Sequence, residues 1–456
     1  MSKSKLKRWS VLLLCGSMAL GVGCSKSNES SDKQAKPNAT TQSATETENK
    51  TETKTEASDP VKISFLNSKG EIQEQLETMA TTFTAENPNI TVEVIPCAAG
   101  QSPFEMLTTL YAANNAPALA MLDPADVSAF KENLGDLSQE KWVNDTMPGA
   151  LDSLKADDKI IGFPFAVEGW GLIYNKNVLD EANVDPTTIN TTAKLEEAFQ
   201  KIEANGKSGV IITPADWSLG AHLFTTAFSD QSSNTSDIKK VLEELSTNKA
   251  NIKDNVVVNG LLDTFDVMKK YNYAKADPLS AAYETNPKQL GEGEVGFWFM
   301  GNWAWANIKE FAGDNTNFGF IPVPISNNEA DYGNTQLPVA TTKAIVLDAS
   351  QNSIEQQNAA KVFLDWIVYQ ENGQKGLVQE CSIIPAFTNI SIEINDPLGK
   401  SIQQYIKDGK TSNGVMLSNK HWADVGAAMQ KYLGNYSERE ELFSTISEYW
   451  ASGDYK

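Results

Sequence analysis

The sequence predicts an α/β fold with two lobes, each a mainly parallel sheet flanked by helices. Strands and helices alternate between Lys62 and Leu122, and strands separated by helices pair in parallel. The folded part of the chain, about 400 residues, is longer than one hydrophobic core usually covers, which predicts two lobes. The segment 294–308, EVGFWFMGNWAWANI, begins as a strand that is apolar on both faces. Such strands lie in sheets that helices cover on both sides.

The N-terminus has the features of an export signal. Basic residues precede an apolar run from Trp9 to Leu20, which is too short to span a bilayer as a helix. Small residues follow up to Gly23, and Cys24 then stands where lipoproteins are cleaved and acylated. We expect residues 1–23 to be a signal peptide and Cys24 to be lipidated. An ordinary secretory signal or a retained membrane anchor are the alternatives.

Residues 24–59 are expected to form a disordered tether behind the lipidated cysteine. From Ser25 to Asp59 the chain contains no aromatic residue and no aliphatic residue larger than alanine, so it has nothing with which to build a core. Such a tether would hold the folded part close to the outer face of the cytoplasmic membrane. The formal net charge of −21 argues against a nucleic acid or an anionic membrane surface as a partner.

Hydrophobic periodicity and turn residues place the remaining elements. Strands end where Gly, Pro, Asn or Asp follows an apolar run, and helices are placed where apolar residues recur three or four positions apart. The sequence predicts strands at 62–67, 90–95, 119–122, 160–167, 172–174, 210–213, 318–323 and 344–347, and helices at 71–84, 104–113, 192–204, 219–228, 255–271, 356–369 and from 401 onward.

The segment that follows the strand in 294–308 predicts a ligand-binding position. Asn302 is a suitable N-cap for a new helix, on which Ala304, Ile308 and Phe311 form an apolar stripe. Trp303 lies off this stripe, at the carboxyl end of a strand, where open α/β sheets bind ligands. We expect its ring to be exposed to a ligand. The alternative is that all tryptophans of this segment belong to the core.

The cysteines and histidines of the folded part give weaker information. Export permits a disulfide between Cys97 and Cys381, but their separation in sequence leaves the pairing open. His222 and His421 are the chain's only histidines and form no cluster of the kind that binds a metal ion. The sequence therefore predicts neither a metal site nor a cofactor.

Two strings resemble the maltose/maltodextrin-binding proteins, which are extracellular solute-binding lipoproteins of ABC importers. They are AVEGWGLIYNKNVL at 166–179 and GNWAWANI at 301–308, and weaker similarity covers most of residues 60–456. The resemblance implies a periplasmic-binding-protein-like fold, with sugar bound between two lobes. Three hinge crossings are then expected near 167–170, 337–341 and 380–384. Lobe 1 would comprise 60–168, completed by about 341–380, and lobe 2 would comprise 169–340, completed by about 381–456.

The same resemblance implies the site residues. By match, Glu168 accepts hydrogen bonds from sugar hydroxyls and Trp303 stacks on a sugar ring. The segment around Asp126 lacks the tryptophan and the arginine that accompany this aspartate in maltose binders, which leaves the identity of the sugar open. The further candidates for ligand binding are Lys69, Asp123, Asp126, Trp170, Trp217 and Trp422.

The chemistry of these residues agrees with a neutral sugar. Carboxylates accept hydrogen bonds from hydroxyls, and indole rings cover the C–H faces of pyranoses. Anionic ligands usually require arginine, and Arg439 is the only arginine after the signal. We therefore expect a monomeric protein that captures a neutral oligosaccharide, with maltodextrin as one candidate, and delivers it to an ABC transporter permease without catalysis.

Two other functions remain open at this point. A lipid-anchored surface glycosidase would need two carboxylates about 5–10 Å apart, and a sequence this acidic does not exclude such a pair. A structural or adhesive surface protein would show repeats or a cell-wall anchor, and we find neither in the sequence. Analysis of the sugar after long incubation would separate a binding protein from a glycosidase.

Overall fold

The computed structural model describes residues 60–97, 101–147 and 149–453. The signal peptide at 1–23, the lipidated Cys24 and the tether lie outside the described residues, so these expectations stay predictions. Among the helices that are described, none is long and apolar enough to cross a membrane.

The strands of the described residues form one large sheet and one small hairpin. The large sheet has nine strands, and its central path runs β2-β1-β3-β10-β6-β8-β7, with β11 beside β10 and β9 beside β6. The strands are β1 (Val61–Asn67), β2 (Ile90–Pro96), β3 (Leu119–Leu122), β4 (Lys155–Ala156), β5 (Lys159–Ile160), β6 (Phe163–Asn175), β7 (Ser208–Ile211), β8 (Val295–Gly301), β9 (Phe318–Ile321), β10 (Leu337–Leu347) and β11 (Thr411–Asn413).

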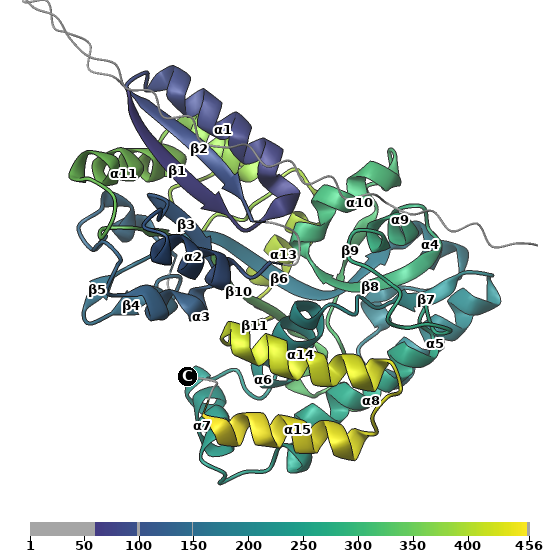
Figure 1. Cartoon of the computed structure of the whole chain (residues 1–456). Coiled ribbons are helices and arrows are strands. Elements are labelled where there is room, and N and C mark those ends of the chain that lie inside the picture. The colour runs from purple at the N-terminus through teal and green to yellow at the C-terminus, as the bar shows by residue number, and fades with distance from the viewer. Residues whose placement is uncertain (1–59, 98–100, 148, 454–456) are drawn as a thin grey trace, which may run out of the picture. The chain divides into compact units, whose positions relative to one another are not determined.

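Two long strands, β6 and β10, run through both lobes and join their sheets (Figure 1). The first half of β6 pairs with β10, and its second half pairs with β8 and β9. The outer strands pair in parallel, β1 with β2 and β3 in lobe 1 and β7 with β8 in lobe 2. The two crossing strands are antiparallel to each other. The lobe boundaries expected at 168/169 and 340/341 therefore fall inside continuous strands.

The sequence predicted two strands, 160–167 and 172–174, where the structure has the single strand β6. Gly169 and Gly171 interrupt the apolar run in sequence and suggest a turn. In the structure both are ordinary strand residues, since Gly169 pairs with Val339 and Gly171 pairs with Met300. Pairing with strands far along the chain, which a local pattern does not contain, keeps this segment extended.

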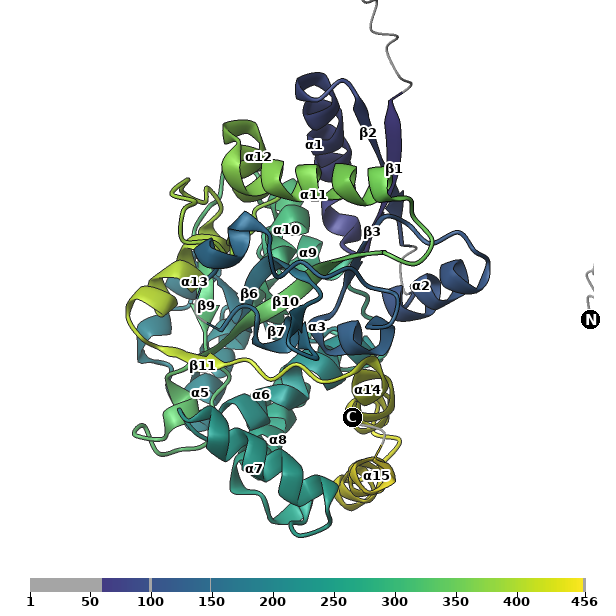
Figure 2. The same ribbon diagram turned by 90° about the vertical axis from the view of Figure 1, so that its left-hand side faces the viewer.

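Helices α1 (Gln73–Glu86) and α11 (Ile354–Tyr369) lie side by side in lobe 1 (Figure 2). The ring of Phe363 on α11 meets Phe83 of α1 at a centroid distance of 5.0 Å and Phe65 of β1 at 6.3 Å. These three rings fix both helices over the same strand. The other lobe 1 helices are α2 (Pro103–Ala112), α3 (Pro124–Val127) and α12 (Glu371–Lys375).

The sheet of lobe 2 is covered on both faces, as the segment 294–308 predicted. Phe297 and Phe299 of β8 belong to one hydrophobic cluster, and Trp298 and Met300 belong to the other. The helices of this lobe are α4 (Lys176–Glu181), α5 (Thr192–Ala204), α6 (Thr225–Ser229), α7 (Thr235–Ser246), α8 (Val256–Lys270), α9 (Asn286–Gly291), α10 (Trp305–Ala312), α13 (Pro397–Lys407), α14 (Asn419–Leu433) and α15 (Arg439–Ser452).

A third segment leads from lobe 1 into lobe 2 after α12 and a π-helix at Gly376–Glu380. It passes beside β6, where the N–H of Val167 donates to the carbonyl of Ile384 at 3.1 Å. It then enters α13, whose Ser401 hydroxyl accepts from the N–H of Phe320 in β9 at 3.1 Å. The fold is thus the two-lobed architecture with three crossings that the resemblance implied.

The two cysteines of the described residues are free thiols. Cys381 is buried at the start of the third crossing, with its Sγ 3.6 Å from Sδ of Met79. Cys97 is half-buried at the end of β2 and donates to the carbonyl of Gln101 at 3.3 Å. The disulfide that the sequence left open is therefore not formed in this structure.

Candidate ligand-binding cleft

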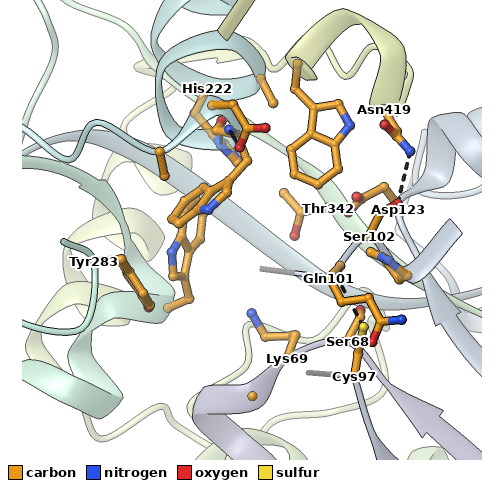
Figure 3. A pocket seen from close by; sticks show the side chains of 18 of the residues that line it. Ser68, Lys69, Cys97, Gln101, Ser102, Asp123, His222, Tyr283, Thr342 and Asn419 are labelled. Atoms are coloured by element: carbon orange, nitrogen blue, oxygen red, sulfur yellow. Dashed lines mark hydrogen bonds between the residues drawn. The ribbon is translucent and has the colours of Figure 1, made fainter. Parts of the chain in front are cut away.

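A cleft with a volume of about 1050 Å³ lies between the two lobes, next to the crossing strands. Figure 3 looks into it, with Lys69 and Asp123 reaching in from lobe 1, Thr342 from β10, and His222 and Tyr283 from lobe 2. A volume of this size is at the upper end of what small-molecule sites occupy. The cleft therefore has room for a ligand of several rings.

Glu168 of β6 and Lys69 form a buried ion pair at the bottom of the cleft. Their side chains are 2% and 4% exposed, and Nζ of Lys69 lies 2.8 Å from Oε1 of Glu168. The same Nζ lies 2.7 Å from Glu71, and the hydroxyl of Thr342 donates to the other oxygen of Glu168. Burial opposes the charge on Lys69, but the two carboxylates outweigh it, so the pKa of Lys69 is raised. Both charges are therefore held in place before any ligand binds.

The end of β1 fixes the position of Lys69. The side chain of Asn67, the last residue of β1, accepts from the backbone N–H of Lys69 at 2.8 Å and donates to the carbonyl of Lys69 at 2.9 Å. These two bonds hold the turn after the strand, so the ammonium group is presented at the carboxyl end of a parallel strand, where ligands bind in open α/β sheets.

A bulge in β10 directs two neighbouring side chains into the cleft. Successive residues of a regular strand point to opposite faces of the sheet. The register of β10 against β6 shifts on both sides of Lys343, and Thr342 and Lys343 both line the cleft. Lys343 forms an ion pair with Asp123, which follows β3. Bulges of this kind re-aim side chains next to functional sites.

Trp303 contributes a half-buried ring to the lobe 2 side of the cleft. The turn Asn302–Ala304 follows Gly301, and the indole folds back over that glycine, so that a Cβ on Gly301 would lie 2.0 Å from Cζ3 of Trp303. Ala304 and Ile308 are buried. Phe311, the third residue of the expected stripe, is half-buried, as Trp303 is. The stripe is therefore confirmed for Ala304 and Ile308, and Trp303 lies off it.

The prediction that Asn302 caps the following helix is wrong. Gly301 occupies the N-cap position of the first turn, and Asn302 makes no capping bond. The side chain of Asn302 instead accepts from the N–H of Gly169 at 2.9 Å. Asn302 is 1% exposed, and this buried hydrogen bond ties the start of the turn to the crossing strand β6.

Trp217 and Trp422 reach the cleft from two helices that touch at glycines. Trp217 begins a π-helix at Trp217–Phe224, and Trp422 lies in the first turns of α14. A Cβ on Gly220 would lie 2.7 Å from the backbone nitrogen of Gly426 and from the carbonyl oxygen of Trp422. Glycine at this contact allows the two backbones to approach closely. Both indoles therefore line the same side of the cleft.

Two predicted site residues, Trp170 and Asp126, do not line the cleft, which corrects the sequence interpretation. Trp170 is fully buried, and its Nε1 donates to the hydroxyl of Thr226 at 3.2 Å. Asp126 is 5% exposed, and its Oδ1 accepts from the N–H of Asn419 at the start of α14 at 3.2 Å. Trp170 thus belongs to the core of lobe 2, and Asp126 belongs to the contact between the lobes.

Burial and the neighbouring carboxylate of Asp123 raise the pKa of Asp126 to about 7. Asn419 also donates from its side chain to the hydroxyl of Ser102 on lobe 1 at 3.0 Å. The N-terminus of α14 is thus bonded to lobe 1 at two residues, so the lobes are in contact across one end of the cleft.

Sequence reasoning missed two aromatic residues of the cleft, His222 and Tyr283. The ring of His222 lies 4.9 Å from Trp303 and 5.9 Å from Trp217, between centroids. Tyr283 lies 5.3 Å from Trp217, and its hydroxyl accepts from Asn307 at 3.2 Å. Burial raises the pKa of Tyr283. Tyr283 was missed because it lies in an irregular segment without periodicity. His222 was missed because it follows Trp217 by five positions, and residues five apart share a face in a π-helix but not in an α-helix.

Two α/β lobes joined by three crossings, with a polar and aromatic cleft between them, define a hinged binding protein. The chain belongs to the bacterial extracellular solute-binding protein family, which matches residues 78–407. This confirms the resemblance to the solute-binding proteins of ABC importers.

Individual relatives are more distant. The maltodextrin-binding protein MdxE of Bacillus subtilis (strain 168) is 23% identical over 376 residues, covering 78% of this chain and 81% of that protein. The melibiose/raffinose/stachyose-binding protein MelE of the same organism is 21% identical over 371 residues, covering 79% and 82%. A solved complex of the solute-binding protein RafE with raffinose has a TM-score of 0.70 at 18% identity and covers 86% of this chain and 99% of that one. RafE has also been solved in its apo form from Streptococcus pneumoniae.

Proposed function

We propose that the protein binds a neutral oligosaccharide in the cleft and delivers it unaltered to the permease of an ABC transporter. The observation that supports this most is the composition of the cleft, in which the indoles of Trp217, Trp303 and Trp422 line the same space as the buried carboxylate of Glu168. Indoles match the C–H faces of sugar rings, and carboxylates match their hydroxyls.

The carboxylate of Glu168 can serve a sugar without leaving its partners. An ionised carboxylate offers about four lone-pair sites. Lys69 and Thr342 each use one of these sites. A ligand hydroxyl would take a remaining site and would form a charge-assisted hydrogen bond, which is stronger than a bond to a neutral acceptor.

The charges around the cleft favour an uncharged ligand. Both lysines among the described cleft-lining residues, Lys69 and Lys343, are already paired with carboxylates. An anionic sugar would have to displace these carboxylates or remain unpaired, which is costly in a buried site. The relatives named as binders of maltodextrin and of melibiose, raffinose and stachyose support a neutral oligosaccharide as the class of ligand.

Glu168 and Asp123, two of the carboxylates that line the cleft, do not form the pair that a glycosidase needs. That mechanism needs one carboxyl group to donate a proton and a second to act as nucleophile or base. Both oxygens of Glu168 accept hydrogen bonds, from Lys69 and from Thr342, and Asp123 is engaged by Lys343. Neither group is placed as a proton donor.

We place the protein on the outer face of the cytoplasmic membrane as a monomer, anchored through lipid on Cys24 and the tether at 24–59. Cys24→Ala should move the protein from the membrane fraction to the medium, whereas a neighbouring Ser25→Ala variant serves as a control. A Cys24→Ala protein that remains with the membrane would contradict the anchor.

Calorimetric titration of residues 60–456 tests the proposed function. We expect at least one of maltotriose, raffinose, stachyose and chitotriose to bind, and a charged trisaccharide of galacturonic acid not to bind. Chromatography of the recovered sugar should show the original chain length after long incubation. Binding of only the charged sugar, or recovery of shortened products at catalytic turnover, would overturn the proposal.

A further inference from the structure

We propose that Nε2 of His222 is an uncharged hydrogen-bond acceptor for a hydroxyl of the ligand, beside the ring of Trp303. The proposal rests on the function proposed above and adds a residue that selects among sugars. His222 lines the cleft, and its side chain is half-buried there. The other aromatic residues of the cleft that are described offer indole N–H donors or a phenol.

The hydrogen bond at the other ring nitrogen fixes the tautomer. Nδ1 of His222 lies 3.0 Å from the carbonyl oxygen of Trp217. A carbonyl oxygen carries no hydrogen, so Nδ1 must be the donor in this contact. A neutral imidazole has a single N–H, and the proton on Nδ1 therefore leaves Nε2 with a free lone pair.

The charge state of the ring agrees with this assignment. Burial lowers the pKa of His222 to about 4, although the Trp217 carbonyl and the charges of Asp123 and Glu168 oppose the shift. Lys343 acts in the same direction as burial. The ring is therefore neutral around neutral pH, and Nε2 can only accept.

The surroundings hold the ring in one orientation. Its centroid lies 5.3 Å from Trp170, 5.9 Å from Trp217 and 4.9 Å from Trp303, with the first two rings nearly perpendicular to it. Trp170, which is itself outside the cleft, thus acts as a support for His222. A side chain that is ordered before binding loses less conformational entropy when the ligand arrives, which favours affinity.

This placement determines which sugars are accepted. A sugar stacked on Trp303 presents its hydroxyl groups at its edge, within reach of groups beside that ring. An acceptor without a hydrogen satisfies a hydroxyl but not an ether or acetal oxygen. A sugar that is deoxygenated or O-methylated at this position would leave Nε2 unpaired in a closed cleft, and sites of this kind reject such analogues strongly.

Nitrogen NMR tests the tautomer in the protein without sugar. The chain has two histidines, so the spectrum of the imidazole nitrogens is simple, and a His222→Phe variant assigns it. We expect Nδ1 of His222 to be protonated and Nε2 to be bare at neutral pH. A protonated Nε2 would overturn the proposal. His421, which is fully buried and outside the cleft lining, is the internal reference.

Titration then tests the contact, with whichever neutral sugar of the panel binds. The Nε2 resonance of His222 should shift on saturation while the resonances of His421 stay in place. His222→Phe keeps a flat ring but removes the acceptor and should weaken binding by about three- to tenfold. His222→Gln can restore an acceptor and should recover part of the affinity.

Monodeoxy analogues of the same sugar separate a direct contact from a structural role. Wild type should lose affinity for one analogue, and His222→Phe should bind that analogue and the parent sugar equally. If every analogue loses the same factor in both proteins, His222 only supports the fold and the proposal fails. If no neutral sugar binds wild type, the proposed function falls, and this inference falls with it, whatever tautomer the spectrum shows.

Discussion

The two sides of the cleft are built differently. Lobe 1 and the crossing strands supply charged groups that are already paired, Lys69 with Glu168 and Asp123 with Lys343. Lobe 2 supplies rings, Trp217, Trp303 and Trp422 among them, which are only partly buried without a ligand. The polar side therefore gains few new interactions when sugar arrives, whereas the aromatic side gains the burial of its rings.

This difference assigns different tasks to the two sides. In the proposed function, burial of apolar surface on the rings is expected to provide most of the affinity, and we expect the sugar to be held mainly by the aromatic side. Fixed charges add direction, since their hydrogen bonds are satisfied only by hydroxyls in the right places. Closure of lobe 1 over a sugar held by lobe 2 is the hinge motion expected of such proteins.

The largest effect is expected for Trp303→Ala. Removing a central aromatic ring from an interface typically costs about 2 kcal/mol or more, which is a loss of affinity of roughly thirtyfold. Because the ring is half-buried without ligand, the free energy of unfolding should fall by at most about 2 kcal/mol. Titration calorimetry measures the first quantity, and denaturant unfolding without sugar measures the second.

Trp298→Ala is the matched control, since Trp298 lies five residues earlier and is fully buried. It should cost about 3–5 kcal/mol of folding stability and leave the affinity per folded molecule nearly unchanged. If Trp303→Ala behaves like Trp298→Ala, Trp303 is a core residue and the division between the two sides of the cleft is wrong.

Glu168→Gln tests the polar side and should have a smaller effect. The amide keeps the shape but loses the charge, so affinity should fall by about five- to tenfold. The buried Lys69 keeps Glu71 as a partner, and the free energy of unfolding should fall by about 1–3 kcal/mol.

Glu71→Gln is the control for this effect, since it weakens the same cluster of charges from its other end. It should lower stability but change affinity less than Glu168→Gln. Equal losses of affinity in the two variants would mean that the ammonium of Lys69, rather than the carboxylate of Glu168, recognises the sugar.

The sequence predicted best those features that depend on neighbouring residues. Helices α8 and α11 agree with the expected ranges 255–271 and 356–369 to within two residues at each end. Strand β8 followed from the alternation in 294–308, and the half-buried position of Trp303 at the cleft followed from the helical stripe in the same segment. These patterns record which face of an element is buried, and that information is local.

Features that depend on distant partners were not predictable. β6 is one strand because residues far along the chain pair with its glycines, and Asn302 is used by Gly169 rather than by its own helix. His222 lines the cleft from a helix with π geometry, which the spacing of apolar residues did not predict. The sequence match assigned Asp126 to the ligand, but its Oδ1 accepts a hydrogen bond from the N–H of Asn419 at the start of α14.

Asp126→Asn should have the smallest effect on affinity, less than about twofold, because the side chain lies behind the cleft. Its effect on folding should depend on pH. The pKa of Asp126 is raised in the folded protein, mainly by burial, from the ordinary 3.8 to about 7. The folded state therefore binds more protons than the unfolded state between these values, and the stability contributed by this group is lost as the pH rises through that window.

Asparagine in place of Asp126 can keep the bond from the Asn419 N–H and carries no charge. The substitution breaks no bond at Oδ2 of Asp126, because that atom has no hydrogen-bond partner among the described residues. We expect the variant to be more stable than wild type by on the order of 2 kcal/mol above neutral pH, with the difference shrinking on acidification. Denaturant unfolding across this pH range measures it. A loss of sugar affinity comparable to that of Glu168→Gln, with no pH-dependent gain in stability, would instead mean that Asp126 binds the sugar, as the sequence match implied.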